Sequence, residues 1–124
     1  MARLFLDTNT FIDIIEKRAS ISIESFKHYT LFISPLSVHI LTYLYKYKVP
    51  DSKLDNLEKY YNIVAFDLSV VLDSITGPTS DFEDNVQLHS AAEVDADFFF
   101  TRDKRLLALK FFGKTEIVNR IIPD

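Results

Sequence analysis

Short apolar runs alternate with segments of helical periodicity along most of the chain. Five runs have the length and composition of buried strands, at residues 3–7, 30–34, 62–67, 97–101 and 116–119. Between them, apolar residues recur every three or four positions, which predicts helices over residues 8–18, 22–29, 35–48, 51–61, 68–75, 80–94 and 103–112. Strands that alternate with helices need crossover connections. The pattern therefore predicts an α/β fold with a mostly parallel sheet covered on both faces.

Several predicted helices carry residues that favour a boundary. Pro35 suits the first turn of a helix, because proline lacks a backbone N–H and an N–H in this turn has no acceptor within the helix. Ser80 and Glu83 form the pattern of a capping box, a hydroxyl followed three residues later by an acid. Gly113 ends the last predicted helix. No repeat, low-complexity stretch or linker interrupts this order of elements.

The composition is that of a single folded domain over residues 1–124. Hydrophobic residues make up 48% of the chain and charged residues 26%, which suits a buried core and excludes disordered and collagen-like classes. Cysteine is absent, so disulfides and thiolate metal sites are excluded. No apolar run approaches the roughly 20 residues that span a bilayer, and the first residues lack the cleavage site of a signal peptide. We expect no membrane contact and a cytoplasmic location.

Charge is distributed unevenly along the chain. With 18 acids and 14 bases the net charge is −4, which argues against a polyanionic partner such as RNA. Residues 60–101, however, contain no Lys or Arg and carry eight of the acids. The remaining sequence holds 14 bases against 10 acids, a local balance of +4. The average charge therefore does not exclude RNA as a partner.

Acids gather where the predicted strands end. Asp7 ends the first strand, Asp67 ends the third, and Asp103 follows the fourth. Asp84 lies in the first turn of the helix that begins near residue 80. In parallel α/β sheets, functional groups gather beyond the carboxyl ends of the strands. We therefore expect several carboxylates to converge on one edge of the sheet.

The expected group of carboxylates suits a divalent cation. Carboxylates held close together repel one another unless a cation lies among them. Their oxygens suit Mg²⁺ or Mn²⁺, which keep several waters when bound. Such a metal activates a bound water and offsets charge on a phosphate, so the pattern favours phosphodiester hydrolysis. Asn9 and Thr101 are placed to orient an acid or a metal-bound water from just outside the ligand shell.

Four segments of the chain resemble, in order, the motifs of the PIN-domain family. They are Leu6-Asp7-Thr8-Asn9, Ile33-Ser34-Pro35-Leu36-Ser37, Asp81-Phe-Glu-Asp84-Asn-Val-Gln-Leu and Ala96-Asp-Phe-Phe-Phe-Thr-Arg-Asp103-Lys104. The match covers almost the whole chain. It implies a three-layer α/β/α sandwich with a mostly parallel sheet of about five strands. It also implies a Mg²⁺- or Mn²⁺-dependent endoribonuclease that hydrolyses RNA phosphodiester bonds.

The resemblance extends to partners and to individual residues. Many stand-alone members of the family are VapC-type toxins of toxin–antitoxin pairs and commonly form homodimers, which implies an antitoxin protein and a second copy of the chain as partners. The family's acidic pocket carries over onto Asp7, Asp84 and Asp103, as catalytic and metal-binding residues, with Thr101 beside them. Asp81 is a further metal ligand in members that carry the Asp-Phe-Glu-Asp string.

One position departs from the family pattern. The family usually has Glu in the helix after the second strand, where this sequence has Ile40. Losing that acid removes a ligand or a group just outside the ligand shell and should weaken metal binding, unless Asp13 or Asp81 compensates. His39 is about 100° away around the helix and does not replace the acid directly. The alternative function is therefore a catalytically weakened PIN-like module that binds RNA or a partner protein without cutting.

Two sets of residues are candidate contacts for RNA. Arg102 and Lys104 flank Asp103, where a phosphate backbone would pass, although both also suit a solvated turn. The second set interleaves rings with cations: Tyr43, Tyr45, Lys46, Tyr47 and Lys48. It is either an RNA-contacting patch of stacking rings and phosphate-binding cations or, as the preferred interpretation, a packing surface for the next helix or a second copy.

A receiver-type signalling domain is a third function class, because it also combines an α/β fold with clustered acids. That class needs paired acids after the first strand and a Lys after the last. Here Asp7 is followed by Thr8-Asn9, and the last strand by Asn119-Arg120, so the pattern disfavours it. The only glycines, Gly77 and Gly113, stand alone, which argues against nucleotide-binding enzymes of the Rossmann or Walker type.

Overall fold

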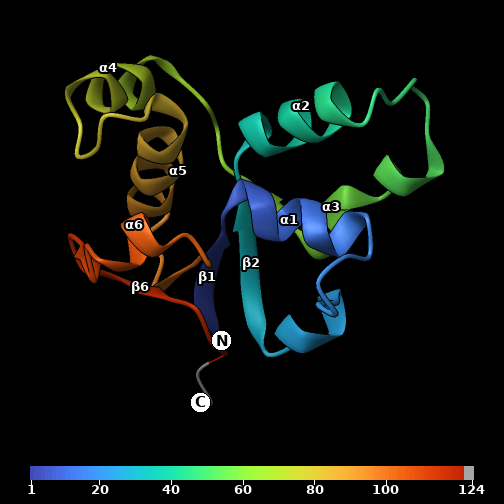
Figure 1. Cartoon of the computed structure of the whole chain (residues 1–124), viewed down its shortest axis with the longest axis horizontal. Coiled ribbons are helices and arrows are strands. Elements are labelled where there is room, and N and C mark those ends of the chain that lie inside the picture. The colour runs from blue at the N-terminus through green and yellow to red at the C-terminus, as the bar shows by residue number, and fades with distance from the viewer. Residues whose placement is uncertain (122–124) are drawn as a thin grey trace.

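A six-stranded sheet with the order β3-β2-β1-β4-β6-β5 forms the centre of the molecule (Figure 1). The computed structural model describes residues 1–121, so the last three residues of the domain predicted over 1–124 lie outside the described part. Five strands run parallel: β1 (Ala2–Leu6), β2 (Tyr29–Ile33), β3 (Asn62–Ile63), β4 (Phe98–Phe100) and β6 (Thr115–Val118). The sixth, β5 (Phe111–Phe112), is antiparallel to β6. The predicted α/β fold with a mostly parallel sheet is confirmed, with six strands in place of about five.

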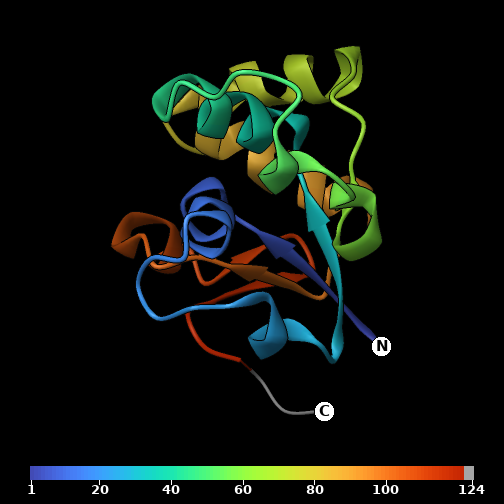
Figure 2. The same ribbon diagram turned by 90° about the vertical axis from the view of Figure 1, so that its right-hand side faces the viewer.

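Helices cover both faces of this sheet (Figures 1 and 2). One face carries α1 (Thr8–Ile15), α2 (Pro35–Leu44) and α3 (Leu57–Tyr60), with 3₁₀ turns at Ile23–Phe26 and Ser52–Leu54. The other face carries α5 (Phe82–Glu93) and α6 (Lys104–Leu107), and α4 (Leu68–Thr76) packs against α5. Within residues 1–121, every helix is too short or too polar to cross a membrane.

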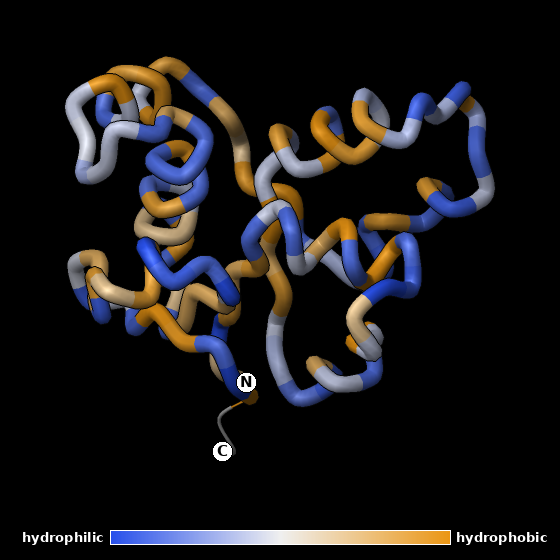
Figure 3. The backbone as a smooth tube through the Cα atoms, viewed as in Figure 1, coloured by the Kyte–Doolittle hydropathy of each residue, from blue (hydrophilic) through white to orange (hydrophobic). Residues whose placement is uncertain are grey.

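Each central strand contributes to two hydrophobic cores. Side chains alternate between the faces of a strand, so Leu4 and Leu6 pack with Phe11 of α1, while Phe5 between them packs with Leu88 of α5. In Figure 3 the strands at the centre of the molecule are accordingly coloured as mostly hydrophobic. The continuous apolar runs in the sequence are therefore strands buried on both faces, as expected for a parallel sheet.

The segment after β4 differs from the sequence prediction. A helix was expected over residues 103–112, but α6 ends at Leu107. Phe111 and Phe112 instead form β5, which pairs with Glu116 and Thr115 of β6. Gly113, with a φ of 60°, lies in the turn between these strands rather than at the end of a helix. Pairing with the sheet edge outweighs the helical spacing of the apolar residues in this segment.

Three other predicted elements are reduced to short pieces, and the helices predicted over residues 8–18 and 35–48 end earlier, at Ile15 and Leu44. The strand expected over residues 62–67 is regular only at Asn62–Ile63, and its last residue, Asp67, caps α4 by accepting a 3.1 Å hydrogen bond from the Val70 N–H. The helices expected over residues 22–29 and 51–61 are reduced to the 3₁₀ turns and α3. The carboxyl ends of β1 and β4 keep their predicted places, and they position the candidate site.

Candidate active site

Asp7 lies at the carboxyl end of β1 and caps α1. Its side chain is almost fully buried, at 5% exposure. One carboxylate oxygen, Oδ1, accepts a 2.8 Å hydrogen bond from the Thr10 N–H, and the other, Oδ2, accepts a 2.5 Å bond from the Thr101 hydroxyl. Burial raises the pKa of Asp7, although these hydrogen bonds act in the opposite direction. The strand-to-helix turn therefore holds a carboxylate with both oxygens fixed.

Thr101 connects Asp7 to Asp103. It follows β4 directly and is fully buried. Its hydroxyl donates to Asp7 and also accepts a 3.0 Å hydrogen bond from the Asp103 N–H. Asp103 in turn caps α6 by accepting from the Arg105 N–H at 2.8 Å. One hydroxyl thus joins two acids that come from opposite ends of the sequence.

A cavity of about 230 Å³ opens beside these residues. Its lining consists of Asp7, Asn9, Thr10, Asp13, Arg102 and Asp103. The structure therefore brings together two of the predicted acids with the predicted Asn9 and Arg102. Asp13 lines the cavity as well, but it forms an ion pair with Arg18 at 2.8 Å and lies 4.0 Å from Arg102. Lys104, exposed on α6, is not among the lining residues.

Asp81 and Asp84 approach from the start of α5. Asp81, rather than the predicted Ser80, caps this helix: its Oδ1 accepts a 3.0 Å hydrogen bond from the Asp84 N–H. An Asp carboxylate here fits the N-terminal dipole of the helix. The pKa of Asp84 is raised to about 6 by burial and by the carboxylates of Asp81, Asp103 and Glu83, with Arg105 acting against them. The carboxylates of Asp84 and Asp103 are therefore near enough to repel one another, although Asp84 does not line the cavity.

Glu83 is an acid of this site that sequence reasoning assigned elsewhere. The capping-box pattern gave Glu83 a role at the start of the helix, whereas in the structure its carboxylate interacts with the Thr8 side chain and the charge of Asp7. Burial is the largest cause that raises the pKa of Glu83, followed by the carboxylate of Asp81. The charge of Asp7 raises this pKa further, whereas a hydrogen bond with the Thr8 side chain lowers it. Its position next to Asp84 in an acid-rich string was the signal that could have identified it.

A buried polar contact fixes α5 against the turn that carries Asp7. Gln87, only 2% exposed, accepts a 2.6 Å hydrogen bond through Oε1 from the Thr8 N–H. The Thr8 hydroxyl lies 2.9 Å from that of Ser37 in α2. These buried residues connect α1, α2 and α5 at the edge of the sheet. Nothing in the sequence pattern singled out Gln87, because a lone Gln inside a helix carries no positional signal.

The second helix supplies no acid to the site. Ile40 is partly buried and packs against the core formed with Leu41 of the same helix. His39 is exposed, and its ring stacks on that of Tyr43 at 6.3 Å. Neither Ile40 nor His39 replaces the acid that the family usually has at position 40. The carboxylates of the site therefore come from the ends of β1 and β4 and from the start of α5.

The donor chemistry suits a divalent cation, but the side chains are not gathered around one point. Asp7, Asp84, Asp103 and Asp81 offer hard carboxylate oxygens, and burial together with mutual repulsion raises the pKa of Asp84. Across residues 1–121, however, no three His, Cys, Asp or Glu side chains are close enough to bind a metal ion together. A cation shared by these acids would require them to move closer to one another.

Comparisons with known proteins agree with this fold. A family model described as a PIN domain matches residues 3–105. No curated protein matches the sequence significantly. Among solved structures, the fold is similar to a chain in the crystal structure of VapBC2 from Rickettsia felis bound to a DNA fragment from their promoter, with a TM-score of 0.66 and 18% identity. The alignment covers 93% of this chain and 96% of that chain, and at this identity it establishes the fold alone.

Proposed function

The chain belongs to the PIN-domain family, and we propose that it is a metal-dependent endoribonuclease, acting as one PIN-like domain, with its active site at Asp7, Asp84 and Asp103. The observation that carries this proposal is the double hydrogen bond of the Thr101 hydroxyl, which anchors Asp7 and Asp103 to one buried atom. Asp84, in the first turn of α5, is the third residue of the proposed set. Such an arrangement of carboxylates suits phosphodiester hydrolysis better than receiver-type signalling.

Some residues of the proposed site would bind the metal ion, and others keep those metal-binding residues in position. Bound by Asp7, Asp84 and Asp103, with Asp81 as a further ligand, Mg²⁺ or Mn²⁺ would supply an activated water and offset charge on the phosphate. Thr101 and the Thr10 N–H hold the two oxygens of Asp7 in place. Gln87 fixes α5, which carries Asp84, against the turn after Asp7.

The basic residues near the cavity suit contacts with the RNA backbone. Arg102 lines the cavity, and its side chain is 44% exposed, so a phosphate can displace its long contact with Asp13. Lys104 is exposed on α6, the helix that Asp103 caps. Asn9 offers a neutral amide from the wall of the cavity. These side chains place positive and neutral groups around an acidic centre, as an RNA phosphate requires.

The decisive test is RNA cleavage by an Asp84→Asn variant. The wild-type protein should cleave single-stranded RNA in Mg²⁺ or Mn²⁺ and lose this activity in EDTA, and Asp84→Asn should reduce cleavage by at least about a hundredfold with an unchanged circular dichroism spectrum. Asp73→Asn is the matched control, because Asp73 is an exposed acid of α4 in the same base-free segment. Equal cleavage by both variants would refute the assignment.

A non-cutting RNA- or protein-binding module is the second candidate function. Two observations favour it: Ile40 packs against the core where the family has an acid, and no three acids share one point within residues 1–121. This module would bind RNA without turnover at any Mg²⁺ or Mn²⁺ concentration. If Ile40→Glu produces cleavage that the wild-type protein lacks, the weakened module is the better description. Cleavage by the wild-type protein excludes it.

An antitoxin partner is the next part of the proposal. One structural neighbour is a chain in the crystal structure of VapBC2 bound to a promoter DNA fragment, and its fold matches this chain over nearly its whole length. We infer that this chain is the toxin of a comparable pair. If a small antitoxin-like reading frame lies beside its gene, co-expression of the two should yield a stable complex with reduced RNA cleavage. A neighbouring product that neither binds nor inhibits would contradict this inference.

A homodimer through α4 is the last part of the proposal. The face of α4 formed by Leu68, Leu72 and Ile75 is 71%, 55% and 68% exposed at these three side chains. Their spacing places them on one apolar stripe of the helix. Because residues 60–101 contain no base, pairing of two α4 helices brings acids together, so added salt should strengthen the dimer. Light scattering should show a dimer that Leu72→Glu disrupts and that Tyr60→Glu, on α3, leaves intact; a wild-type monomer would contradict it.

A further inference from the structure

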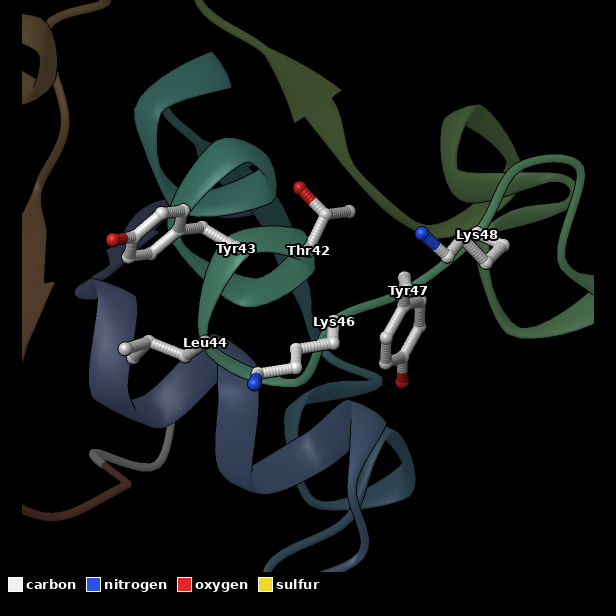
Figure 4. A pocket seen from close by; sticks show the side chains of 6 residues that line it. All are labelled: Thr42, Tyr43, Leu44, Lys46, Tyr47 and Lys48. Atoms are coloured by element: carbon white, nitrogen blue, oxygen red, sulfur yellow. The ribbon is translucent and has the colours of Figure 1, made fainter.

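We propose that the end of α2 is a binding surface for single-stranded RNA, in which Tyr43 stacks on a base and Lys46 and Lys48 bind phosphates. This inference rests on the proposed ribonuclease function and assigns its substrate a path away from the acidic site. The α2-end surface consists of Thr42, Tyr43, Leu44, Lys46, Tyr47 and Lys48 (Figure 4).

The backbone at the end of α2 spreads these side chains around a hollow. The helix ends at Leu44, Lys46 adopts a left-handed φ of 54°, and the Tyr47 N–H returns to the Thr42 carbonyl at 3.0 Å. This turn closes the end of the helix, and side chains before and after it line a cavity of about 580 Å³. Figure 4 shows Tyr43 and Lys48 at opposite ends of the surface, with Lys46 between them.

The two lysines of the surface are available to an anionic ligand. No acid lines the cavity, and within residues 1–121 neither Lys46 nor Lys48 forms an ion pair. The neighbouring cations differ, because Arg18 pairs with Asp13 and Lys53 pairs with Glu16. Positive charge that the protein itself does not neutralise is what phosphate binding requires.

The two tyrosines of the surface differ in exposure and in contacts. Tyr43 is 75% exposed, and one side of its ring stacks on His39. Packing of Tyr43 against the next helix, one half of the preferred sequence interpretation, is therefore wrong, whereas packing against a second copy stays a prediction. Tyr47 is held: its hydroxyl donates to Glu16, and Lys53 lies 5.8 Å from its ring centroid. Tyr47 is fixed by these contacts, whereas the ring of Tyr43 is exposed. An unpaired base would therefore stack on Tyr43 rather than on Tyr47.

The surface is connected to the acidic site by α2 itself. Ser37, in the first turn of α2, contacts Thr8, which follows Asp7 in the chain. From Ser37 to Tyr43 the helix rises by about 9 Å, a length that a few nucleotides of extended RNA span. Bases within a duplex are already stacked on one another, so an exposed ring favours single strands. RNA reaching from the acidic site along α2 would thus meet Tyr43 and then the lysines.

The test is the affinity of a fluorescein-labelled single-stranded RNA of about 12 nucleotides, measured by anisotropy in EDTA so that cleavage does not interfere. Tyr43→Ala should weaken binding by about tenfold. Lys46→Asn should weaken it about threefold and reduce its salt dependence, since one phosphate contact is lost. A duplex of the same sequence should show little effect of Tyr43→Ala.

The chain offers matched controls for both variants. Tyr60→Ala removes another exposed tyrosine, on α3. Lys110→Asn removes one positive charge from a residue that, like Lys46, has a left-handed φ, here 66°. Both controls should bind RNA as the wild type does. If Tyr43→Ala binds no more weakly than Tyr60→Ala, or changes the oligomeric state, the RNA surface is refuted, and the second result would identify a contact between copies.

Different results would refute the ribonuclease proposal and the RNA surface at the end of α2. If the wild-type protein binds RNA through Tyr43 and never cleaves it, the RNA surface stands and the ribonuclease proposal fails. If the protein cleaves RNA and Tyr43→Ala leaves the affinity unchanged, the ribonuclease stands and the RNA surface fails. Because binding is measured without metal, neither result depends on the other.

Discussion

The acidic sheet edge and the α2-end surface differ in how their side chains are held. At the edge, Asp7 and Thr101 come from positions 94 residues apart and meet in a buried hydrogen bond. At the end of α2, Tyr43 and Lys46 come from one short segment and are exposed. Groups that bind a reacting phosphate need fixed positions, whereas groups that hold a flexible polymer need access. Substitutions at the edge should therefore change stability as well as activity, and those at the α2-end surface should change affinity alone.

Of the substitutions within the acidic edge and the α2-end surface, Thr101→Val should have the largest effect on stability. Valine keeps the volume but removes both hydrogen bonds of the hydroxyl, which leaves a buried Asp7 oxygen and the Asp103 N–H without their partner. We expect a loss of about 3 kcal/mol in the free energy of unfolding, measured by urea denaturation.

The matched control is Thr115→Val. Thr115 is equally buried, but its hydroxyl donates only to the carbonyl of Ala96, at 2.8 Å. Its substitution should cost about 1 kcal/mol, because no carboxylate depends on it. Equal losses for the two variants would show that Thr101 is an ordinary core residue, and the contrast between the edge and the α2-end surface would lose its main support.

Asp84→Asn should increase stability at neutral pH while abolishing activity. The folded-state pKa of Asp84, about 6, lies above the ordinary value of 3.8, so the folded protein binds this proton more tightly than the unfolded chain does. The contribution of Asp84 to stability is therefore present below about pH 4 and is lost as the pH rises through about 6. After allowance for solvent screening of this half-buried group, we expect the neutral amide of the variant to add about 1 kcal/mol at pH 7.5 and little at pH 4.

Thermal melting with and without a divalent cation checks the same point. In EDTA the variant should melt above the wild type, and Mg²⁺ or Mn²⁺ should raise the melting temperature of the wild type more than that of Asp84→Asn, because ligand binding stabilises the folded state. A variant that is less stable than the wild type at pH 7.5 would contradict the repulsion among these carboxylates.

Much of the edge could be predicted from the sequence, because parallel strands bring their carboxyl ends together. Asp7 and Asp103 follow apolar runs, and that placement was enough to expect them at one edge. Glu83 and Gln87 could not be assigned in this way, since their roles depend on how α5 is rotated against β1. Helical periodicity sets which residues share a face, but not which neighbour that face meets.

The fold shows the same limit at its C-terminal end. Phe111 and Phe112 fit the spacing of the preceding helix, and only the antiparallel partner in β6 reveals them as a strand. Strand pairing depends on residues that lie elsewhere in the chain, so local spacing does not determine it. The exposure of Tyr43 is a similar case: its apolar ring suggested packing, and only the path of the following segment leaves it open.

Tyr43→Ala should have the smallest effect on stability. A side chain that is 75% exposed buries little area, so we expect the free energy of unfolding to change by less than about 0.5 kcal/mol even though RNA affinity falls. Tyr61→Ala is the contrasting variant, because Tyr61 is buried and its ring packs edge-on against Phe11 at 5.3 Å. It should cost about 4 kcal/mol. A large loss for Tyr43→Ala would mean that the α2-end surface is part of the folded core, and its free ring would no longer distinguish it from the acidic edge.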